Sequence, residues 1–149
     1  MIRPVNVHGT AIVIGTTGLI FVGPSGSGKS SIALHCLHRA HMHGLFSALV
    51  GDDQVLVHEA NGHIVARTPP SIAGLAEIRG AGVYPVNAIP RAVLQRAIMP
   101  VVPPFSERIA PENEDFEVLS GFSLPLSRLP VHPGCDPFAA LATIAPEIT

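Results

Sequence analysis

A chain of 149 residues with 47% hydrophobic and only 13% charged residues is rich in core-forming side chains, and we expect one domain over residues 1–149. The net charge of -2 argues against a nucleic-acid partner, and no apolar run reaches the roughly 18 residues of a membrane span. Cys36 and Cys135 form no C-x-x-C pair, which favours reduced thiols. These observations predict a cytoplasmic protein that binds neither nucleic acid nor membrane.

The first third of the chain alternates β-rich runs with one helical segment. Residues 10–14 and 19–22 are short β-rich runs around Gly15-Thr-Thr-Gly18, and they predict a hairpin. Residues 30–43 have the pattern of a helix, which Gly44 ends. Residues 46–50 are typical of a buried strand because the run is short and continuously apolar.

The rest of the chain contains another hairpin, breaks and two helical patterns. Asn61-Gly62 between β-rich runs predicts a hairpin, and Ser71 is expected to cap a short turn before residues 76–79. Gly80–Gly82 is expected to be a mobile junction. Further along, we expect a short helix at 91–98, a polar surface loop at 106–117 and an Ala-rich helix at 137–144. This order indicates an α/β fold with a mixed sheet and flanking helices.

The most specific motif is Gly23-Pro-Ser-Gly-Ser-Gly-Lys-Ser30, which matches the phosphate-binding template G-x-x-x-x-G-K-[ST] between a strand and a helix. The glycines let successive N–H groups point into one concavity, and the helix start adds its positive dipole end. Lys29, the sole lysine, would reach the β and γ phosphates, while Ser30 would bind Mg²⁺. The expected nucleotide-binding residues are Gly23, Pro24, Ser25, Gly26, Ser27, Gly28, Lys29 and Ser30.

Acidic residues follow at the positions where a phosphate-loop protein needs them. Asp52 and Asp53 end an apolar strand, so one carboxylate can face the metal and the other can face an acceptor hydroxyl as general base. An Asx turn is the alternative. Glu77 and Arg79 flank a Gly-x-Gly element and would supply a metal ligand and a charge anchor, or else only a salt-bridged surface turn.

The remaining candidates are basic. His8 stands at a strand start, and Arg108 lies in the polar loop, where it could stabilise charge or be a plain surface residue. Four histidines at 35, 38, 41 and 43 partly share a helix face, but without Cys or acidic partners a solvated face is favoured over a metal site.

Together these motifs resemble the catalytic domain of HPr kinase/phosphorylase, the bacterial protein serine kinase that acts on the phosphocarrier HPr. The resemblance runs in order along the chain through V-H-G, the phosphate loop, L-V-G-D-D, the signature E-I-R-G-A-G and V-H-P-G. Those strings begin at Val7, Gly23, Leu49, Glu77 and Val131. The chain is similar to short forms of the family from α-proteobacteria, without the usual N-terminal domain and much of the C-terminal helical tail.

The resemblance implies a role for each matched residue. Lys29 would bind phosphate, Asp53 would be the catalytic acid and base with Asp52 close by, and His8 would assist. Ser30 and Glu77 would be the metal ligands. Arg79 would anchor the signature loop, and Arg108 would match a late catalytic arginine.

The resemblance also implies a fold, cofactors and partners. The fold would be a P-loop kinase domain related to phosphoenolpyruvate carboxykinase, commonly assembled as a hexamer. ATP and Mg²⁺ would be the cofactors, and the acceptor would be a serine of HPr or of its nitrogen-related paralogue. Phosphorolytic dephosphorylation would be a second activity. The protein would act in the control of carbon and nitrogen metabolism. Two alternatives stay open: a small-molecule P-loop kinase and a nucleotide-binding regulatory module without phosphotransfer.

Overall fold

The centre of the molecule is a pair of strands that are buried on both faces. The computed structural model describes residues 3–149, and in it every residue of β2 (Thr10–Ile14) and β3 (Thr17–Phe21) is buried. The other main-sheet strands are β1 (Val5–His8), β4 (Ser47–Gly51), β5 (Gln54–Ala60), β6 (His63–Arg67), β9 (Arg91–Val101), β10 (Asp115–Leu119) and β11 (Phe122–Pro130). The helices are α1 (Lys29–Met42) and α2 (Pro137–Ile144), with 3-10 turns at Pro70–Ile72 and Pro146–Ile148.

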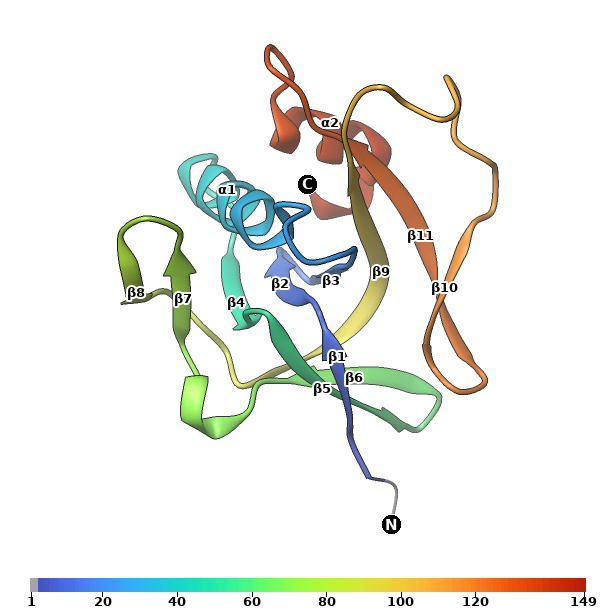
Figure 1. The fold of residues 1–149 in the computed structure, drawn as a ribbon. Helices are drawn as coiled ribbons and strands as arrows, with labels where there is room; N and C mark the ends of the chain where they lie inside the picture. The colour runs from blue at the N-terminus through green and yellow to red at the C-terminus, as the bar shows by residue number, and fades with distance from the viewer. Residues whose placement is uncertain (1–2) are drawn as a thin grey trace.

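These strands form a curled sheet of mixed direction (Figure 1). Its order is β1-β5-β6-β9-β3-β2-β4, and β11 joins β9 while β10 joins β11. The β3–β9 and β9–β11 pairs are parallel, and the other pairs are antiparallel. The predicted mixed sheet with flanking helices is confirmed, as are both predicted hairpins, β2–β3 and β5–β6.

The helix predicted at residues 91–98 is wrong, because this segment is part of the long strand β9. Leu94, Ala97 and Ile98 have the spacing of a helix. However, Ala97 and Ile98 are both fully buried, and each belongs to a different core cluster. Adjacent apolar residues that face opposite ways belong to a strand covered on both faces. Pairing of β9 with β6, β3 and β11 overrides the helical preference of Leu, Gln, Arg and Ala.

The two faces of the sheet carry separate cores. Ile12 and Phe21 pack in the cluster that includes side chains of α1 and α2, whereas Ala11 and Ile20 belong to the cluster on the opposite face. This alternation along β2 and β3 is the period-two pattern of a strand, with apolar residues on both sides. None of the helices in residues 3–149 is long and apolar enough to cross a membrane.

A separate hairpin, β7 (Leu75–Ile78) and β8 (Gly82–Pro85), projects beside β4 and α1 (Figure 1). The segment predicted as a turn and a mobile junction is therefore a second, two-stranded sheet whose connection is Arg79–Ala81. Ser71 lies within the 3-10 turn rather than at its cap. The polar surface loop is shorter than predicted, because β10 begins at Asp115.

The predicted C-terminal helix is confirmed, and Asp136 ties its start to α1. The Asp136 carboxylate accepts a hydrogen bond from Phe138 N, lies 3.1 Å from His35 Nε2 and accepts a 3.4 Å bond from Arg39. His43 stacks on Phe138 with ring centroids 5.4 Å apart. In residues 3–149 no group of three or more His, Cys, Asp or Glu side chains is arranged to hold a metal ion. His38 and His41 are exposed on α1.

Exchanging Asp136 for Asn is expected to lower stability more at pH 7 than at acidic pH, where the carboxyl becomes protonated. The hydrogen bond from His35 leads the contacts that hold the pKa of Asp136 below its usual range. Its ionised form therefore stabilises the fold above about pH 4, and this contribution is lost as pH falls through the lowered pKa. Asn caps a helix as well as Asp does, so only the charge changes.

Urea midpoints measured from pH 3 to pH 7 check this expectation, with Asp115→Asn in β10 as the control. The Asp136→Asn curve should converge on the wild-type curve at low pH, and a gap independent of pH would contradict it.

Candidate active site

The predicted phosphate loop connects β3 to α1, and its backbone leaves amide groups free for a ligand. Gly26 and Gly28 have φ of 81° and 85°, in the left-handed region that glycine adopts without steric cost. Gly28 is the N-cap of α1, so no side chain caps the helix, and no acidic residue stands in its first turn. Such an uncapped helix start presents N–H donors and the positive dipole end to an anion.

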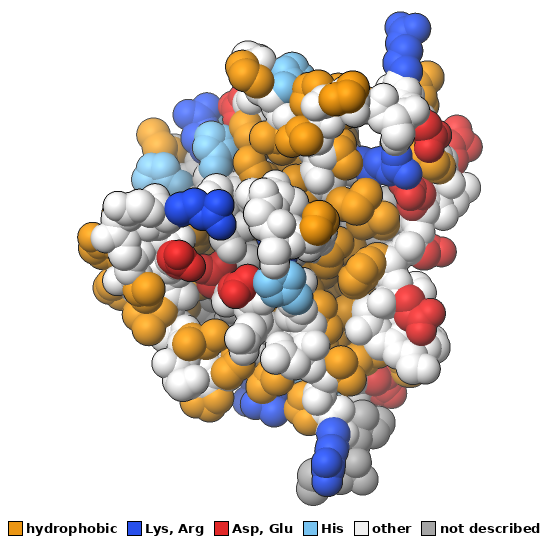
Figure 2. All heavy atoms as spheres, viewed as in Figure 1, with side chains coloured by type: hydrophobic (Ala, Val, Ile, Leu, Met, Phe, Trp, Pro, Cys, Tyr) orange, Lys and Arg blue, Asp and Glu red, His pale blue; other side chains and the backbone are white. Residues whose placement is uncertain are grey.

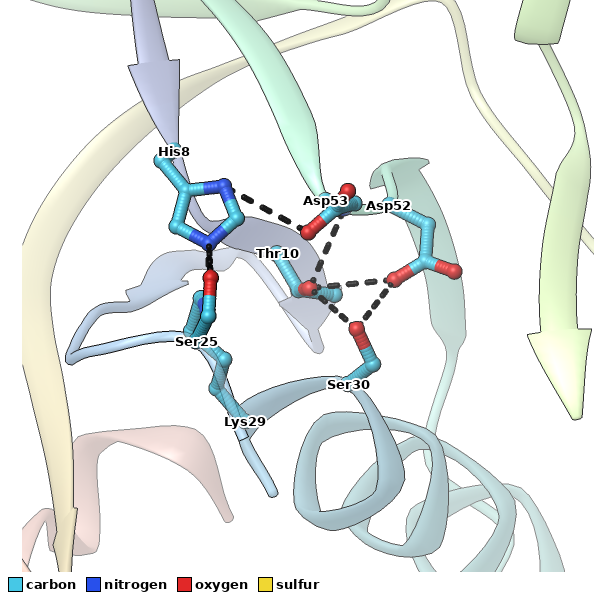
Figure 3. Close-up of polar contacts among 7 residues, drawn as sticks. All are labelled: His8, Thr10, Ser25, Lys29, Ser30, Asp52 and Asp53. Atoms are coloured by element: carbon cyan, nitrogen blue, oxygen red, sulfur yellow. Dashed lines mark hydrogen bonds and ion pairs between the residues drawn. The ribbon is translucent and has the colours of Figure 1, made fainter. Parts of the chain in front are cut away.

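Lys29 and His8 meet over this loop. Lys29 is 4% exposed, and its Nζ lies 2.8 Å from His8 Nε2. An ammonium only donates, so Nε2 accepts and the imidazole carries its proton on Nδ1. Nδ1 in turn lies 3.4 Å from Asp53 Oδ1 (Figure 3). His8 therefore connects Lys29 of the predicted phosphate loop with the second aspartate.

The two adjacent aspartates point to different places. Asp52 is 7% exposed, and its Oδ1 accepts bonds from Ser30 Oγ at 2.7 Å and Thr10 Oγ1 at 3.0 Å. Its Oδ2 accepts the backbone N–H of Glu77 at 3.0 Å. Charge-assisted bonds of this kind orient a buried carboxylate firmly. Asp52 is thus fixed against the serine that ends the phosphate loop.

Asp53 instead faces solvent, with a side chain that is 61% exposed. Its φ of 68° is unusual for a residue other than glycine, although Asp tolerates it better than most. Gly9 N donates to Asp53 O at 3.1 Å, and Asp53 N donates to Thr10 Oγ1 at 3.4 Å. A Cβ at Gly9 would lie 2.8 Å from Phe21 O, so this close approach requires glycine.

Several of these residues line one polar cavity of about 260 Å³. Figure 2 shows acidic side chains and a histidine gathered on this face, with a basic side chain above them and an apolar strip alongside. The predicted residues that line the cavity are His8, Ser25, Gly26, Gly28, Lys29, Ser30, Asp53, Glu77 and Arg79. Asp52 lies against Ser30, and Gly23, Pro24 and Ser27 complete the loop.

Arg108 is not brought to this cavity. It is exposed and lines another cavity, of about 340 Å³, together with Phe105 and Arg128. Arg128 there is held by Glu114 at 2.8 Å. The catalytic role implied for Arg108 by the family resemblance therefore stays a prediction.

The residues present fit ATP and Mg²⁺. The positions where a Cβ would project from Gly26 and Gly28 have no atom within 4 Å, so the loop is open to phosphate oxygens. Ser30 and Asp52 offer oxygen atoms at its base, and Glu77 lines the same cavity. Mg²⁺ is typically held by one or two carboxylates and substrate phosphates rather than by a protein cage.

Two residues of the site escaped the sequence interpretation. Ser31 lines the cavity, and Thr10 contacts Ser30, Asp52 and the backbone of Asp53. The sequence feature that could have identified Thr10 is its position, because it is a polar residue directly before the apolar run Ala11–Ile14 and directly after His8 and Gly9. In a strand buried on both faces, such a residue needs a polar partner.

The fold and the phosphate loop define the class of this protein as a P-loop domain of the kinase type. The structure of the Hpr(Ser) kinase/phosphatase from Coxiella burnetii has the same fold, with a TM-score of 0.78 over 96% of this chain and 89% of that chain, at 22% identity. Residues 1–97 match the model of the HPr Serine kinase C-terminal domain. The chain therefore belongs to the HPr serine kinase family.

Curated relatives agree with this assignment. HPr kinase/phosphorylase of Clostridium beijerinckii is 28% identical over 139 residues, which cover 87% of this chain and 44% of that protein. HPr kinase/phosphorylase of Prosthecochloris aestuarii is 32% identical over 139 residues, which cover 85% of this chain and 38% of that protein. The chain thus spans less than half the length of these curated relatives.

Proposed function

We propose that this protein is an ATP-dependent protein serine kinase whose acceptor is a serine of HPr or of an HPr paralogue. The observation that carries the proposal is the arrangement of Lys29, Ser30 and Asp53 around one polar cavity at the start of α1. Membership in the HPr serine kinase family supports the choice of acceptor. A regulatory module that only binds nucleotide would not need an exposed carboxylate held beside the phosphate loop.

In the proposed reaction, Asp53 takes the proton from the acceptor serine hydroxyl. The serine oxygen then forms a bond to the γ-phosphorus of ATP as the bond to the bridging oxygen breaks and ADP leaves. Lys29 and the loop N–H groups stabilise the charge that spreads over the transferred group. Mg²⁺, held by Ser30 and Glu77 near Asp52, would neutralise phosphate charge when bound. His8 orients Asp53 through its Nδ1.

The same residues support removal of the phosphoryl group from phosphoserine by inorganic phosphate. Phosphate would attack phosphoserine, the serine oxygen would leave with a proton from Asp53, and pyrophosphate would be the second product. Asp53 would then act as acid where it acts as base in the kinase reaction, and the proton given to serine would be replaced by the one that the attacking phosphate loses. We include this phosphorolytic dephosphorylation in the proposal.

We also propose a cytoplasmic homo-oligomer. Apolar side chains stay exposed at Val102, Phe105 and Ile109 in the loop after β9 and at Val83 in β8, with Ile109 79% exposed. Three of these side chains lie close in sequence in one loop, and exposed apolar side chains that gather in one place often mark protein contacts. Light scattering on the purified chain measures the assembly, and a monomer at all concentrations would contradict this part of the proposal.

The experiment that tests the function incubates the protein with ATP labelled on the γ-phosphate, Mg²⁺ and purified HPr, beside HPr whose acceptor serine is replaced by alanine. We expect label on wild-type HPr and none on the alanine form. Adding inorganic phosphate without ATP should then remove the label from isolated phospho-HPr. Bound ATP without label on HPr or its paralogue would favour the regulatory module, and label on a small metabolite would favour the small-molecule kinase.

A further inference from the structure

Thr10 is a polar residue in an otherwise apolar, fully buried strand. It begins β2 and has no exposed surface, while the next four residues of the strand are core side chains. A buried hydroxyl costs free energy unless it is hydrogen-bonded, so its partners explain its presence. Those partners are the two aspartates and the metal-side serine of the site (Figure 3).

The hydrogen-bond roles around Thr10 follow from its partners. A hydroxyl has one proton to donate and two lone pairs that accept. Because a carboxylate only accepts, Thr10 donates to Asp52 Oδ1 at 3.0 Å, and because an amide N–H only donates, Thr10 accepts from Asp53 N at 3.4 Å. One side chain therefore joins the carboxylate of Asp52 to the backbone of Asp53.

Ser30 completes the arrangement. Its hydroxyl donates to the same Asp52 Oδ1 at 2.7 Å, and its oxygen lies 3.1 Å from Thr10 Oγ1. With the protons of Ser30 and Thr10 both directed at Asp52, the lone pairs of Ser30 remain for a cation. Loss of the Thr10 hydroxyl would leave Asp52 Oδ1 with Ser30 as its one donor, so the carboxylate would be held less firmly against Ser30.

Three consecutive residues hold Asp53 from three directions. His8 contacts its carboxylate, Gly9 donates to its carbonyl, and Thr10 accepts from its N–H. A left-handed φ of 68° in a residue other than glycine is kept only where surrounding contacts impose it. Of these three residues, Thr10 is the one that also contacts Ser30 and Asp52, on the metal side of the site.

We infer that Thr10 is a positioning residue that couples the Ser30–Asp52 pair, on the metal side, to Asp53, on the acceptor side. This inference rests on the proposed kinase function. Thr10 would touch neither ATP nor the acceptor, because it is fully buried behind Ser30 and Asp52. Its hydroxyl would act by keeping both carboxylates in the geometry that transfer requires.

The test compares Thr10→Val, which keeps the shape and removes the hydroxyl, with Thr10→Ser, which keeps the hydroxyl. Losing a hydrogen bond to a charged group corresponds to about a 10- to 100-fold change. We expect kcat for transfer to HPr to fall by about that factor in Thr10→Val and by less than about threefold in Thr10→Ser. The KM for HPr should change by less than about threefold in both, since neither variant alters a substrate contact.

Binding of a fluorescent ATP analogue, with Mg²⁺ and with EDTA, gives a readout that does not depend on transfer. Without Mg²⁺, Thr10→Val should bind the analogue with the affinity of wild type. The factor by which Mg²⁺ raises this affinity should be about tenfold smaller in Thr10→Val than in wild type. This binding result stands even if wild type fails to phosphorylate HPr, so failure of the proposed function and failure of the Thr10 inference are distinguishable.

Three outcomes would overturn the inference. In the first, Thr10→Val keeps the kcat and the Mg²⁺ dependence of wild type. In the second, both variants lose the same fraction of activity, which would indicate that Thr10 contributes packing alone. In the third, a folded Thr10→Ser loses more than about tenfold of kcat, an outcome that can be observed even if Thr10→Val does not fold. Melting temperatures of both variants establish which samples are folded at the assay temperature.

Discussion

Asp53→Asn is expected to reduce kcat for phosphoryl transfer to HPr by about 10³-fold, because a positioned general base contributes roughly 10²- to 10⁴-fold. Asn has the shape of Asp and also tolerates the left-handed φ of 68° at this position. Its backbone can keep the bonds from Gly9 and to Thr10. The substitution therefore removes the proposed proton acceptor and is expected to leave the local fold in place.

ATP binding separates a catalytic from a binding role for Asp53. The Asp53 carboxylate is 61% exposed and is aimed at His8 rather than at Ser30, so we expect Kd for MgATP to change by less than about threefold. Asp115→Asn in β10 removes an exposed carboxylate elsewhere and should leave kcat unchanged. If Asp53→Asn keeps more than a tenth of wild-type kcat, another group must take the serine proton.

The phosphate loop could be predicted from sequence because its conformation is local. Gly26 and Gly28 supply the left-handed backbone, and Lys29 and Ser30 start the helix that follows, so eight consecutive residues contain the whole arrangement. Asp52 and Asp53 were predictable as a pair because they directly follow a buried strand, which ends at Gly51.

The sequence allowed the two aspartates to face different ways, but the contacts that hold them in these orientations could not be predicted in the same way. The orientations depend on Asp53 adopting positive φ, and the contacts that impose it come from Gly9 and Thr10, more than 40 residues earlier. A local pattern carries no information on such contacts. The same limit explains β9, where Leu94 and Ile98 fit a helix until three neighbouring strands pair with the segment.

Arg108 shows a different limit. The family resemblance implied a catalytic role for Arg108. The residue lies in the segment between β9 and β10, which contains no strand or helix that could anchor the alignment with the family. The structure puts it beside Phe105 and Arg128. Residues on irregular loops are positioned by tertiary contacts and by partners, so a motif match there predicts chemistry less well than one on a strand end.

Lys29→Met is expected to lower kcat/KM for transfer by about 10³-fold and to weaken MgATP binding, because in the proposed reaction the sole lysine would supply the point charge at the β and γ phosphates. Met keeps a flexible apolar stem, so the buried space near α1 stays filled. Arg91→Met, at an exposed position at the start of β9, removes a cation elsewhere and should leave both quantities unchanged.

The same substitution is expected to leave the ligand-free protein as stable as wild type, or more stable. Lys29 is 4% exposed, and its ammonium contacts the imidazole of His8 rather than a carboxylate, so its burial is poorly compensated. Thermal unfolding with and without MgATP measures both effects, since a ligand that binds the folded state raises Tm. We expect MgATP to raise Tm for wild type but not for Lys29→Met. A destabilised ligand-free variant would show instead that the lysine stabilises the fold, and an unchanged Tm shift with MgATP would show that phosphate binding does not depend on it.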